Sequence, residues 1–140
     1  MLFDESTQRY LVQKIAPNPY YNGGLWNTSA GGHVDENETY LDTVLRELAE
    51  EMGVYGMHSP REVLRYKTTK TSFRAGDTRT YNRHNVTHLA LIDGTSLEMQ
   101  LGDEVEEAAW FTVVELKSMR DSSAKVMTDA LEYFVDQYLH

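Results

Sequence analysis

Residues 32–54 read GHVDENETYLDTVLRELAEEMGV, and this stretch decides the fold. Turn-forming and acidic residues crowd its first part, and apolar residues then recur every three or four positions. That spacing predicts an amphipathic helix that begins after Glu38 and turns one apolar face toward a core. The predicted apolar face consists of Leu41, Val44, Leu45, Leu48 and Met52.

Three glutamates share another side of the predicted helix. Glu47 precedes Glu50 by three residues and Glu51 by four, and side chains at these spacings are neighbours on a helix surface, here away from the apolar face. Carboxylates so close together repel one another, so they require a compensating cation. Because clustered carboxylate oxygens suit Mg²⁺ or Mn²⁺, the sequence predicts a site for metal-bound phosphates.

The residues around this helix have architectural interpretations. Arg46 stands four residues before Glu50 and eight after Glu38, so its guanidinium can tie the preceding loop to the helix through a carboxylate, and we assign the Arg46–Glu38 pair to the architecture. The pair of glycines at 31–32 permits close approach of a ligand. Gly53 follows the helix at the position where a left-handed cap is expected.

The stretch resembles the signature of the Nudix hydrolases: glycine, five residues, glutamate, seven residues, Arg-Glu, an apolar residue, any residue, Glu-Glu, any residue, glycine and an apolar residue. Residues 32–54 fill every specified position. The resemblance implies an α/β/α Nudix sandwich with a mixed β-sheet, formed as one domain by residues 1–140. It also implies that Glu47, Glu50 and Glu51 are catalytic and bind Mg²⁺, or Mn²⁺, with the Gly31 carbonyl as a further metal ligand.

The general base is a separate question, because the family places it either within the signature or on a distal loop. Residues 102–107, Gly-Asp-Glu-Val-Glu-Glu, form an acidic distal segment here. Glu104 is the first candidate for the catalytic base and Glu107 the second. The alternative is that the acidic segment is only a solvated loop.

Further elements follow from local signals. Thr112, three residues before Glu115, predicts a capping box that opens a helix through about Met119. Apolar residues at helical spacing predict a last helix over residues 122–139. Segments rich in β-branched and aromatic residues predict strands at residues 9–15, 86–92 and 108–111.

Composition limits the functions that remain. The formal charge of -9 argues against a general nucleic-acid surface, which needs a basic field. No apolar run approaches the length of a membrane helix and no charged-then-apolar leader is present, so we expect a cytoplasmic protein without a membrane partner. The absence of cysteine excludes disulfides, thiolate metal sites and cysteine nucleophiles.

The missing cysteine also bears on a competing activity. Residues 26–33, Trp-Asn-Thr-Ser-Ala-Gly-Gly-His, resemble the loop of isopentenyl diphosphate isomerases, which share the Nudix fold. Those enzymes carry a catalytic cysteine in this loop. The matching position here is Gly31 or a neighbour, so the proton relay that moves the double bond lacks a member, and isomerase activity is disfavoured.

Substrate contacts are expected from the segment between the signature helix and the strand at 86–92. It holds five of the thirteen basic residues, interleaved with aromatic side chains. Arginine recognises phosphate through its planar fork and an aromatic ring can stack on a base, although a basic surface loop can equally just balance charge. The basic residues are Lys67, Lys70, Arg74, Arg79 and Arg83. The predicted substrate-binding residues are Arg74, Arg79, Arg83 and Trp26.

Together these patterns predict a Mg²⁺-dependent pyrophosphohydrolase acting on a small molecule, a nucleoside diphosphate linked to another moiety X. The signature recognises the diphosphate and leaves X open. A non-catalytic, nucleotide-sensing Nudix module is the alternative from another class. Before the turn at Asp4 only residues 1–3 remain, and a short first strand would leave a sheet edge that a second copy could cover, so a homodimer is also predicted.

Overall fold

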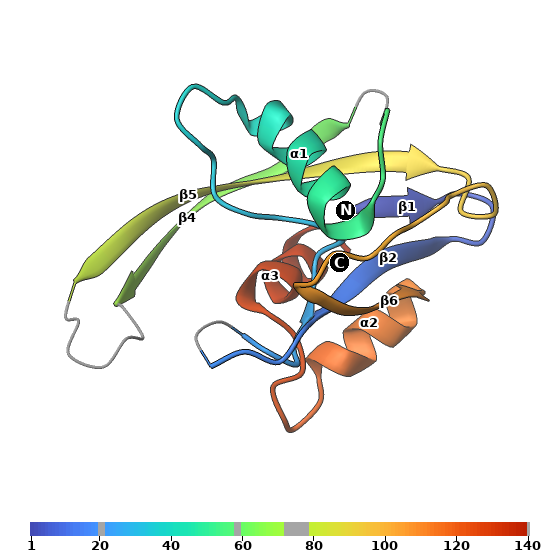
Figure 1. Cartoon of the computed structure of the whole chain (residues 1–140). Helices are drawn as coiled ribbons and strands as arrows, with labels where there is room; N and C mark the ends of the chain where they lie inside the picture. The colour runs from blue at the N-terminus through green and yellow to red at the C-terminus, as the bar shows by residue number, and fades with distance from the viewer. Residues whose placement is uncertain (20–21, 58–59, 72–78, 140) are drawn as a thin grey trace.

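The computed structural model describes residues 1–19, 22–57, 60–71 and 79–139. A sheet of six strands runs through the molecule, and three helices pack on its two faces (Figure 1). The strands are β1 (Leu2–Asp4), β2 (Arg9–Ile15), β3 (Trp26–Asn27), β4 (Arg61–Thr71), β5 (Thr80–Ile92) and β6 (Val105–Phe111). The helices are α1 (Tyr40–Met52), α2 (Val113–Arg120) and α3 (Asp129–Gln137).

The sheet is mixed. Its main path runs β3-β2-β1-β5-β4, and β6 pairs with β2. β1 pairs parallel with β5, whereas the pairs of β2 with β1, β3 and β6 and of β4 with β5 are antiparallel. Leu2 therefore has Leu11 of β2 on one side and Ala90 of β5 on the other. The α/β fold with a mixed sheet agrees with the prediction.

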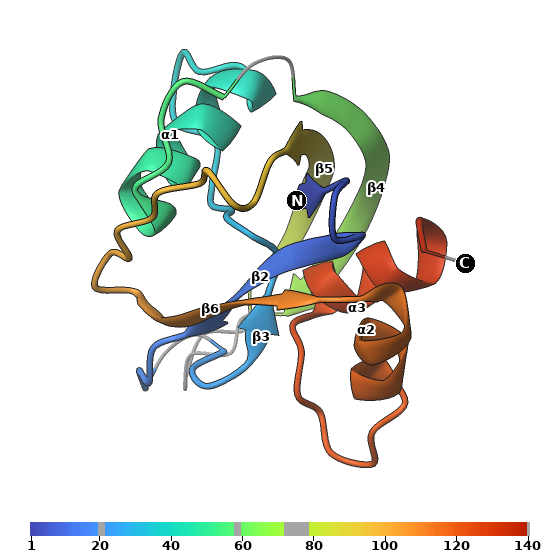
Figure 2. The same cartoon turned by 90° about the vertical axis from the view of Figure 1, so that its right-hand side faces the viewer.

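Alternation along the strands divides the core into two layers. Tyr10 and Val12 of β2 join a cluster with α2 and α3, whereas Leu11, between them, joins a second cluster with α1. β5 divides in the same way, with Leu89 in the first cluster and Ala90 in the second. Successive strand residues point to opposite faces, so α1 covers one face of the sheet and α2 and α3 cover the other (Figure 2).

Two of the helices begin at capping boxes. At α1 the hydroxyl of Thr39 accepts the Asp42 amide at 3.1 Å, and the Asp42 carboxylate accepts the Thr39 amide at 2.9 Å. At α2 the amide of Glu115 donates to the Thr112 hydroxyl and the Glu115 carboxylate accepts the Thr112 amide. The capping box predicted for α2 is therefore confirmed, and the helix ends at Arg120, one residue beyond the prediction.

The last helix is shorter than predicted. It begins at Asp129, with Thr128 as its N-cap, rather than at Ser122. The amide of Trp26 donates to the Val126 carbonyl, and the amide of Thr128 donates to the Trp26 carbonyl. Because these backbone groups pair with β3, residues 126–128 are extended despite their helical apolar spacing.

The segment between α1 and residue 86 differs most from the prediction. The sequence predicts a loop there, but β4 and β5 pair in antiparallel register from Arg61↔Leu89 to Thr71↔Thr80. The resulting hairpin projects beyond the body of the molecule (Figure 1). Its strands are polar on both sides in the projecting part, so the alternation that marks a half-buried strand is missing there. β6 likewise begins at Val105, three residues before the predicted strand.

The first strand lies inside the sheet. β1 pairs with β2 on one side and with β5 on the other, so the expectation that a short first strand would leave an exposed sheet edge is wrong. The outer strands of the main path are β3 and β4. The homodimer stays a prediction without that support. None of the helices within the described residues has the length and apolar character needed to cross a bilayer.

The end of α1 offers a test of the fold. Gly53 has φ 65° and a Cβ there would lie 2.7 Å from backbone atoms of Gln100, whereas Gly56 has φ 67° and open space around it. Both alanine variants adopt an unfavourable left-handed conformation, but only Gly53→Ala also pushes the two segments apart. We expect Gly56→Ala to cost about 1 kcal/mol of unfolding free energy and Gly53→Ala more than about 3 kcal/mol, measured by chemical denaturation. Equal losses would contradict the close approach of Gln100.

Candidate active site

The glycine loop, residues 28–34, lies against the side of α1. A Cβ on Gly32 would fall 2.0 Å from Oε1 of Glu47, a separation that no side chain tolerates. The loop backbone thus runs directly over the Glu47 carboxylate, and a larger residue at Gly32 would displace that carboxylate. Ser29, fully buried, anchors the loop to the sheet by accepting the Leu2 amide at 2.7 Å and donating to the Leu11 carbonyl at 2.5 Å.

α1 is rotated relative to the expectation from its apolar stripe. Leu41 and Leu45 are exposed, at 40% and 36%, while Glu47 and Glu51 retain only 8% exposure each. Glu50, by contrast, points outward with a side chain that is 59% exposed. The prediction placed the glutamates away from the apolar face; Val44, Leu48 and Met52 of that face pack in the core, and Glu47 and Glu51 are buried as well. The helix turns the edge with Glu47 and Glu51 toward the glycine loop and the sheet.

Glu51 is a buried carboxyl of the site with a raised pKa. Its Oε1 accepts the Gly31 amide at 2.8 Å and its Oε2 accepts Nε2 of Gln13 at 3.0 Å. Burial nevertheless raises the pKa of Glu51 to about 7, because the two neutral donors do not offset desolvation and the nearby charges of Glu47 and Glu104 add to it. A buried carboxylate held only by neutral donors is a site where a cation is favoured.

Glu104 reaches this site because its segment runs along the end of α1. The amide of Gln100 donates to the Met52 carbonyl and that of Gly102 to the Glu51 carbonyl, both at 2.9 Å. A Cβ on Gly102 would lie 2.5 Å from the Glu50 carbonyl oxygen, so glycine permits this approach. Glu104 is exposed and its charge acts on Glu51. The alternative candidate, Glu107, sits in β6 opposite Lys14.

Arg46 organises the outer carboxylates. Its Nε donates to one carboxylate oxygen of Glu38 at 2.7 Å, and its Nη2 donates to the other at 3.2 Å. These two hydrogen bonds confirm the predicted pairing of the loop with the helix. The hydrogen bond from Arg46, followed by that from Thr43, lowers the pKa of Glu38 to about 2. Arg46 also contacts Glu47 at 2.8 Å and Glu50 at 3.3 Å. Arg46 therefore compensates the negative charges of Glu47 and Glu50.

The donor set suits a hard divalent cation. In the part of the chain that the structure describes, no three His, Asp or Glu side chains stand close enough together to hold an ion, and Glu47 and Glu50 both contact Arg46. Glu51, however, is a desolvated carboxylate without a cationic partner among its hydrogen-bond donors. Carboxylate oxygens are the ligands that Mg²⁺ and Mn²⁺ prefer, so Glu51 matches the predicted metal in ligand type.

A cavity of about 230 Å³ opens beside these groups, between the glycine loop, α1 and the base of the hairpin. Its wall includes Gly31, Gly32 and Glu47, so Glu47 is the carboxylate of the signature that borders it. A neighbouring hollow runs along the start of the hairpin. It is lined by Gly32, His33, Val34, Tyr40, Arg83, His84 and Asn85.

Comparison with known proteins identifies the family. The model of the NUDIX domain matches residues 1–131. The chain belongs to the NUDIX family. The glycine loop and α1 are its signature elements, and the α/β fold with a mixed sheet is that of the family.

Individual relatives differ in what they are named for. An isopentenyl-diphosphate Delta-isomerase of Photobacterium profundum is 26% identical over 98% of this chain and 77% of its own length. Other curated relatives carry the same name, and the chain spans between 26% and 70% of their lengths. A MutT protein of Methanosarcina mazei has a TM-score of 0.72 at 17% identity, covering 98% of this chain and 86% of that one.

A third similarity concerns a ligand complex. The NUDIX domain of Shewanella oneidensis NrtR, solved in complex with ADP ribose, has a TM-score of 0.59 at 24% identity and covers 84% of this chain and 71% of that one. At these identities the two solved structures share the fold with this NUDIX domain, and the fold alone does not assign a substrate.

The predicted substrate-binding residues separate in the structure. Arg83 lines the hollow beside the glycine loop. Arg79 immediately precedes β5, with its guanidinium 5.7 Å from the ring centroid of Tyr81. Arg74 lies outside the described residues. Trp26 packs edge-on against Phe111 at 5.2 Å and is absent from the described lining of the cavity.

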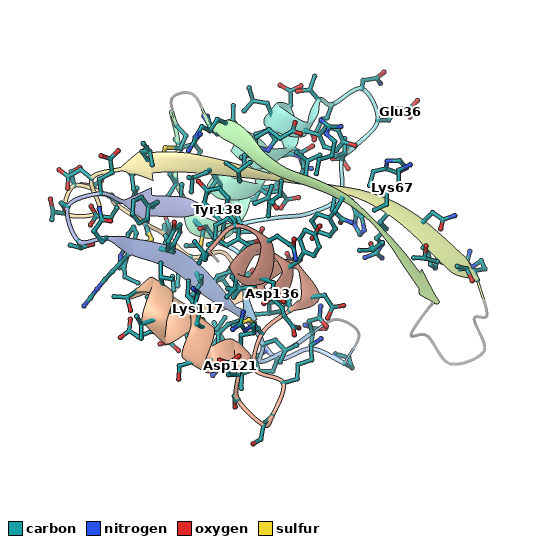
Figure 3. The ribbon with its side chains drawn as sticks, turned by 180° about the vertical axis from the view of Figure 1, so that it is seen from behind. Glu36, Lys67, Lys117, Asp121, Asp136 and Tyr138 are labelled. Carbon is teal, nitrogen blue, oxygen red and sulfur yellow. The ribbon has the colours of Figure 1, made fainter. Side chains whose placement is uncertain are left out.

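The hairpin places its cations at different distances from the NUDIX signature. Lys67 lies on β4 in register with His84. Figure 3 shows it on the projecting hairpin, whereas Lys117 and Asp121, at α2, lie at the opposite end of the molecule from the loop that carries Glu36. Strand register decides how far each described basic residue of the hairpin lies from the NUDIX signature. Sequence spacing does not reveal that register.

Sequence reasoning missed several residues of the site. Gln13 of β2 contacts Glu51, while Tyr40, His84 and Asn85 line the hollow. A polar residue within the otherwise apolar start of β2 was a signal for Gln13, because a buried amide needs partners. The residues of the hollow gave no such signal, since they meet only through the pairing of β4 with β5 and the packing of α1.

The raised pKa of Glu51 predicts how stability depends on pH. The folded protein holds the Glu51 proton up to a pH of about 7, whereas the unfolded chain releases it near its ordinary value of 4.5. The folded state thus binds more protons across that window, and stability falls as pH rises through it. In EDTA, Glu51→Gln should remove a penalty of at most about 3 kcal/mol at pH 8 and little at pH 4.5. Parallel denaturation curves for the two proteins at every pH would contradict this.

Gly32 predicts a second effect. The Cβ of Gly32→Ala would displace the Glu47 carboxyl, which is the far end of a flexible side chain, so the fold should tolerate the change. We expect Mn²⁺ affinity to fall by about 10-fold or more with little change in melting temperature, measured by calorimetric titration and thermal unfolding. Gly56→Ala, with open space around it, is the control for the introduction of alanine. Unchanged Mn²⁺ affinity in Gly32→Ala would separate Glu47 from metal binding.

Proposed function

We propose that this NUDIX protein is a Mg²⁺-dependent hydrolase that cleaves the diphosphate linkage of a nucleoside diphosphate joined to another moiety X. The observation that carries the proposal is the desolvated Glu51 carboxyl, which is influenced by the charges of Glu47 and Glu104 and lacks a cation among its hydrogen-bond donors. Its donor Gly31 and its neighbour Glu47 line the adjoining cavity. A purely structural carboxyl at this place would cost stability without return.

The proposed roles follow from position. Glu47, Glu50 and Glu51 hold the divalent ions, with the Gly31 carbonyl as a further ligand. Bound Mg²⁺ supplies charge neutralisation on the diphosphate and acidifies water. Glu104 is exposed and its charge acts on Glu51, so it is assigned to accept a proton from the attacking water. The water oxygen forms a bond to phosphorus, the bridging P–O bond breaks, and its electron pair leaves with the phosphate-containing product.

Substrate binding is assigned to the hollow next to the glycine loop. Arg83 is the strongest candidate, because its side chain lines this hollow together with Tyr40. A guanidinium there can bind phosphate oxygens and an aromatic ring can stack on a planar group of X. Arg79 and Trp26 remain in the proposal as more remote contacts, and Arg74, which lies outside the described residues, remains a candidate.

Two other activities are favoured by specific observations. The curated relatives are named as isopentenyl-diphosphate isomerases, and the loop at 26–33 resembles theirs. Against isomerisation, the chain contains no cysteine, and Gly31, which is the matching position or its neighbour, donates its amide to Glu51. The solved relative in complex with ADP ribose favours, as a further possibility, a binding module without turnover. The complete set of signature glutamates argues against this possibility.

A substrate panel tests the proposal. Phosphate and pyrophosphate release with Mg²⁺ should be followed for nucleoside triphosphates, sugar nucleotides, dinucleotides and prenyl diphosphates, with phosphatase coupling for monophosphate products and chromatography for an isomerised prenyl diphosphate. We expect turnover of one nucleotide class that EDTA abolishes. Glu50→Gln and Glu51→Gln should each lose at least about 100-fold of kcat. Glu104→Gln should lose about 100-fold or more as a base.

Glu5→Gln, at an exposed turn between β1 and β2, is the matched control and should retain full turnover. Isomerised product without release of phosphate would replace hydrolysis with isomerisation. Tight binding of ADP ribose without turnover of any substrate would replace it with the binding module.

A further inference from the structure

Gln13 occupies an unusual place in the sheet. It is 1% exposed and lies on the face of β2 that also carries Leu11, the face covered by α1. Its neighbours on that face are apolar, so burial of an amide there is costly unless its polar atoms find partners. The contacts of this side chain therefore need a reason beyond packing.

The amide of Gln13 joins the glycine loop to α1. Its Nε2 donates to Oε2 of Glu51 at 3.0 Å and to the Ser29 carbonyl at 3.2 Å. The Gly31 amide holds the other oxygen of Glu51 at 2.8 Å. Each oxygen of the buried carboxyl thus has one neutral donor, one from the loop and one from the sheet.

The anchor for this contact is itself rigid. The hydroxyl of Ser29 is bonded to the backbone of both β1 and β2, so the Ser29 carbonyl that orients the Gln13 amide is fixed to the sheet. The Glu51 carboxyl is consequently oriented by the sheet as well as by its own helix. Neutral donors orient a carboxylate without cancelling its charge, which leaves the charge available to a cation.

We infer that Gln13 is a positioning residue for metal binding: it orients the Glu51 carboxyl toward the glycine loop so that it can take a divalent cation. This inference rests on the proposed function, because it assigns Glu51 to the metal. It goes beyond the signature, since Gln13 lies in β2, outside residues 32–54. Gln13 is not a catalytic residue, because its contacts are to Glu51 and to the loop backbone.

The test measures Mn²⁺ affinity of the metal-free full chain by calorimetry and electron paramagnetic resonance. Gln13→Met keeps the length of the side chain and removes its donors. We expect its Mn²⁺ affinity to fall by about 10- to 100-fold, the range for residues that orient a metal ligand. kcat should fall as well, with little change in KM for the substrate found with the panel.

Thr128→Ala is the matched control for lost stability. Thr128 is 4% exposed, caps α3, which packs on the face of the sheet opposite α1, and donates to Asn27 of β3. If Gln13 only stabilised the fold, the two variants would lose Mn²⁺ affinity in proportion to their loss of melting temperature. We expect loss of affinity in Gln13→Met and unchanged affinity in Thr128→Ala.

Gln13→Asn serves if Gln13→Met does not fold. It retains an amide in the sheet, but the donor is withdrawn from Glu51 by one methylene, so we again expect weaker Mn²⁺ binding. Mn²⁺ affinity within twofold of the native protein in a folded Gln13 variant, while Glu51→Gln loses affinity, would overturn this inference and leave the proposed metal site standing. Absence of Mn²⁺ binding by the native protein would overturn both.

Discussion

The structure depends on the burial of one carboxyl group, that of Glu51, between the glycine loop and the sheet. Removing a carboxylate from water is costly, and the cost is only partly offset by the Gly31 and Gln13 amides, as the rise of its pKa to about 7 shows. Several other features of the molecule are needed to hold this group in place. Gly32 makes room for Glu47, Ser29 ties the loop to β1 and β2, and Gly53 ends the helix tightly enough for residues 100–104 to follow it.

This constraint also explains the orientation of α1. An amphipathic helix would normally bury its apolar stripe, but here Leu41 and Leu45 are exposed while Glu47 and Glu51 are buried. The C-terminal half of the helix still packs through Leu48 and Met52. The helix is therefore rotated about its axis so that Glu47 and Glu51 face the glycine loop. Arg46 compensates the charges of the outer carboxylates by contacting Glu38, Glu47 and Glu50. Local hydrophobic preference is subordinate to the polar contacts of the site.

The relatives show why function has to be argued from these contacts. Curated proteins similar in sequence are named as isopentenyl-diphosphate isomerases, while solved structures with the same fold include a MutT protein and a domain in complex with ADP ribose. A shared fold hosts different chemistries. This chain has every glutamate of the signature and no cysteine. Arg83 and Tyr40 both line the hollow beside the glycine loop.

The sequence by itself determined the elements whose signals are local. The signature helix, its glycine cap, the capping box at Thr112 and the pairing of Arg46 with Glu38 all follow from residues a few positions apart, because the contacts lie within one or two helical turns. Only the tertiary structure decided the rest. Pairing with distant strands produces the β4–β5 hairpin and the internal position of β1. It also keeps residues 126–128 extended, so that α3 begins later than the sequence predicts. The partners of Glu51 come from β2, the glycine loop and the segment before β6, and no spacing along the chain encodes a contact that only packing of the sheet against α1 creates.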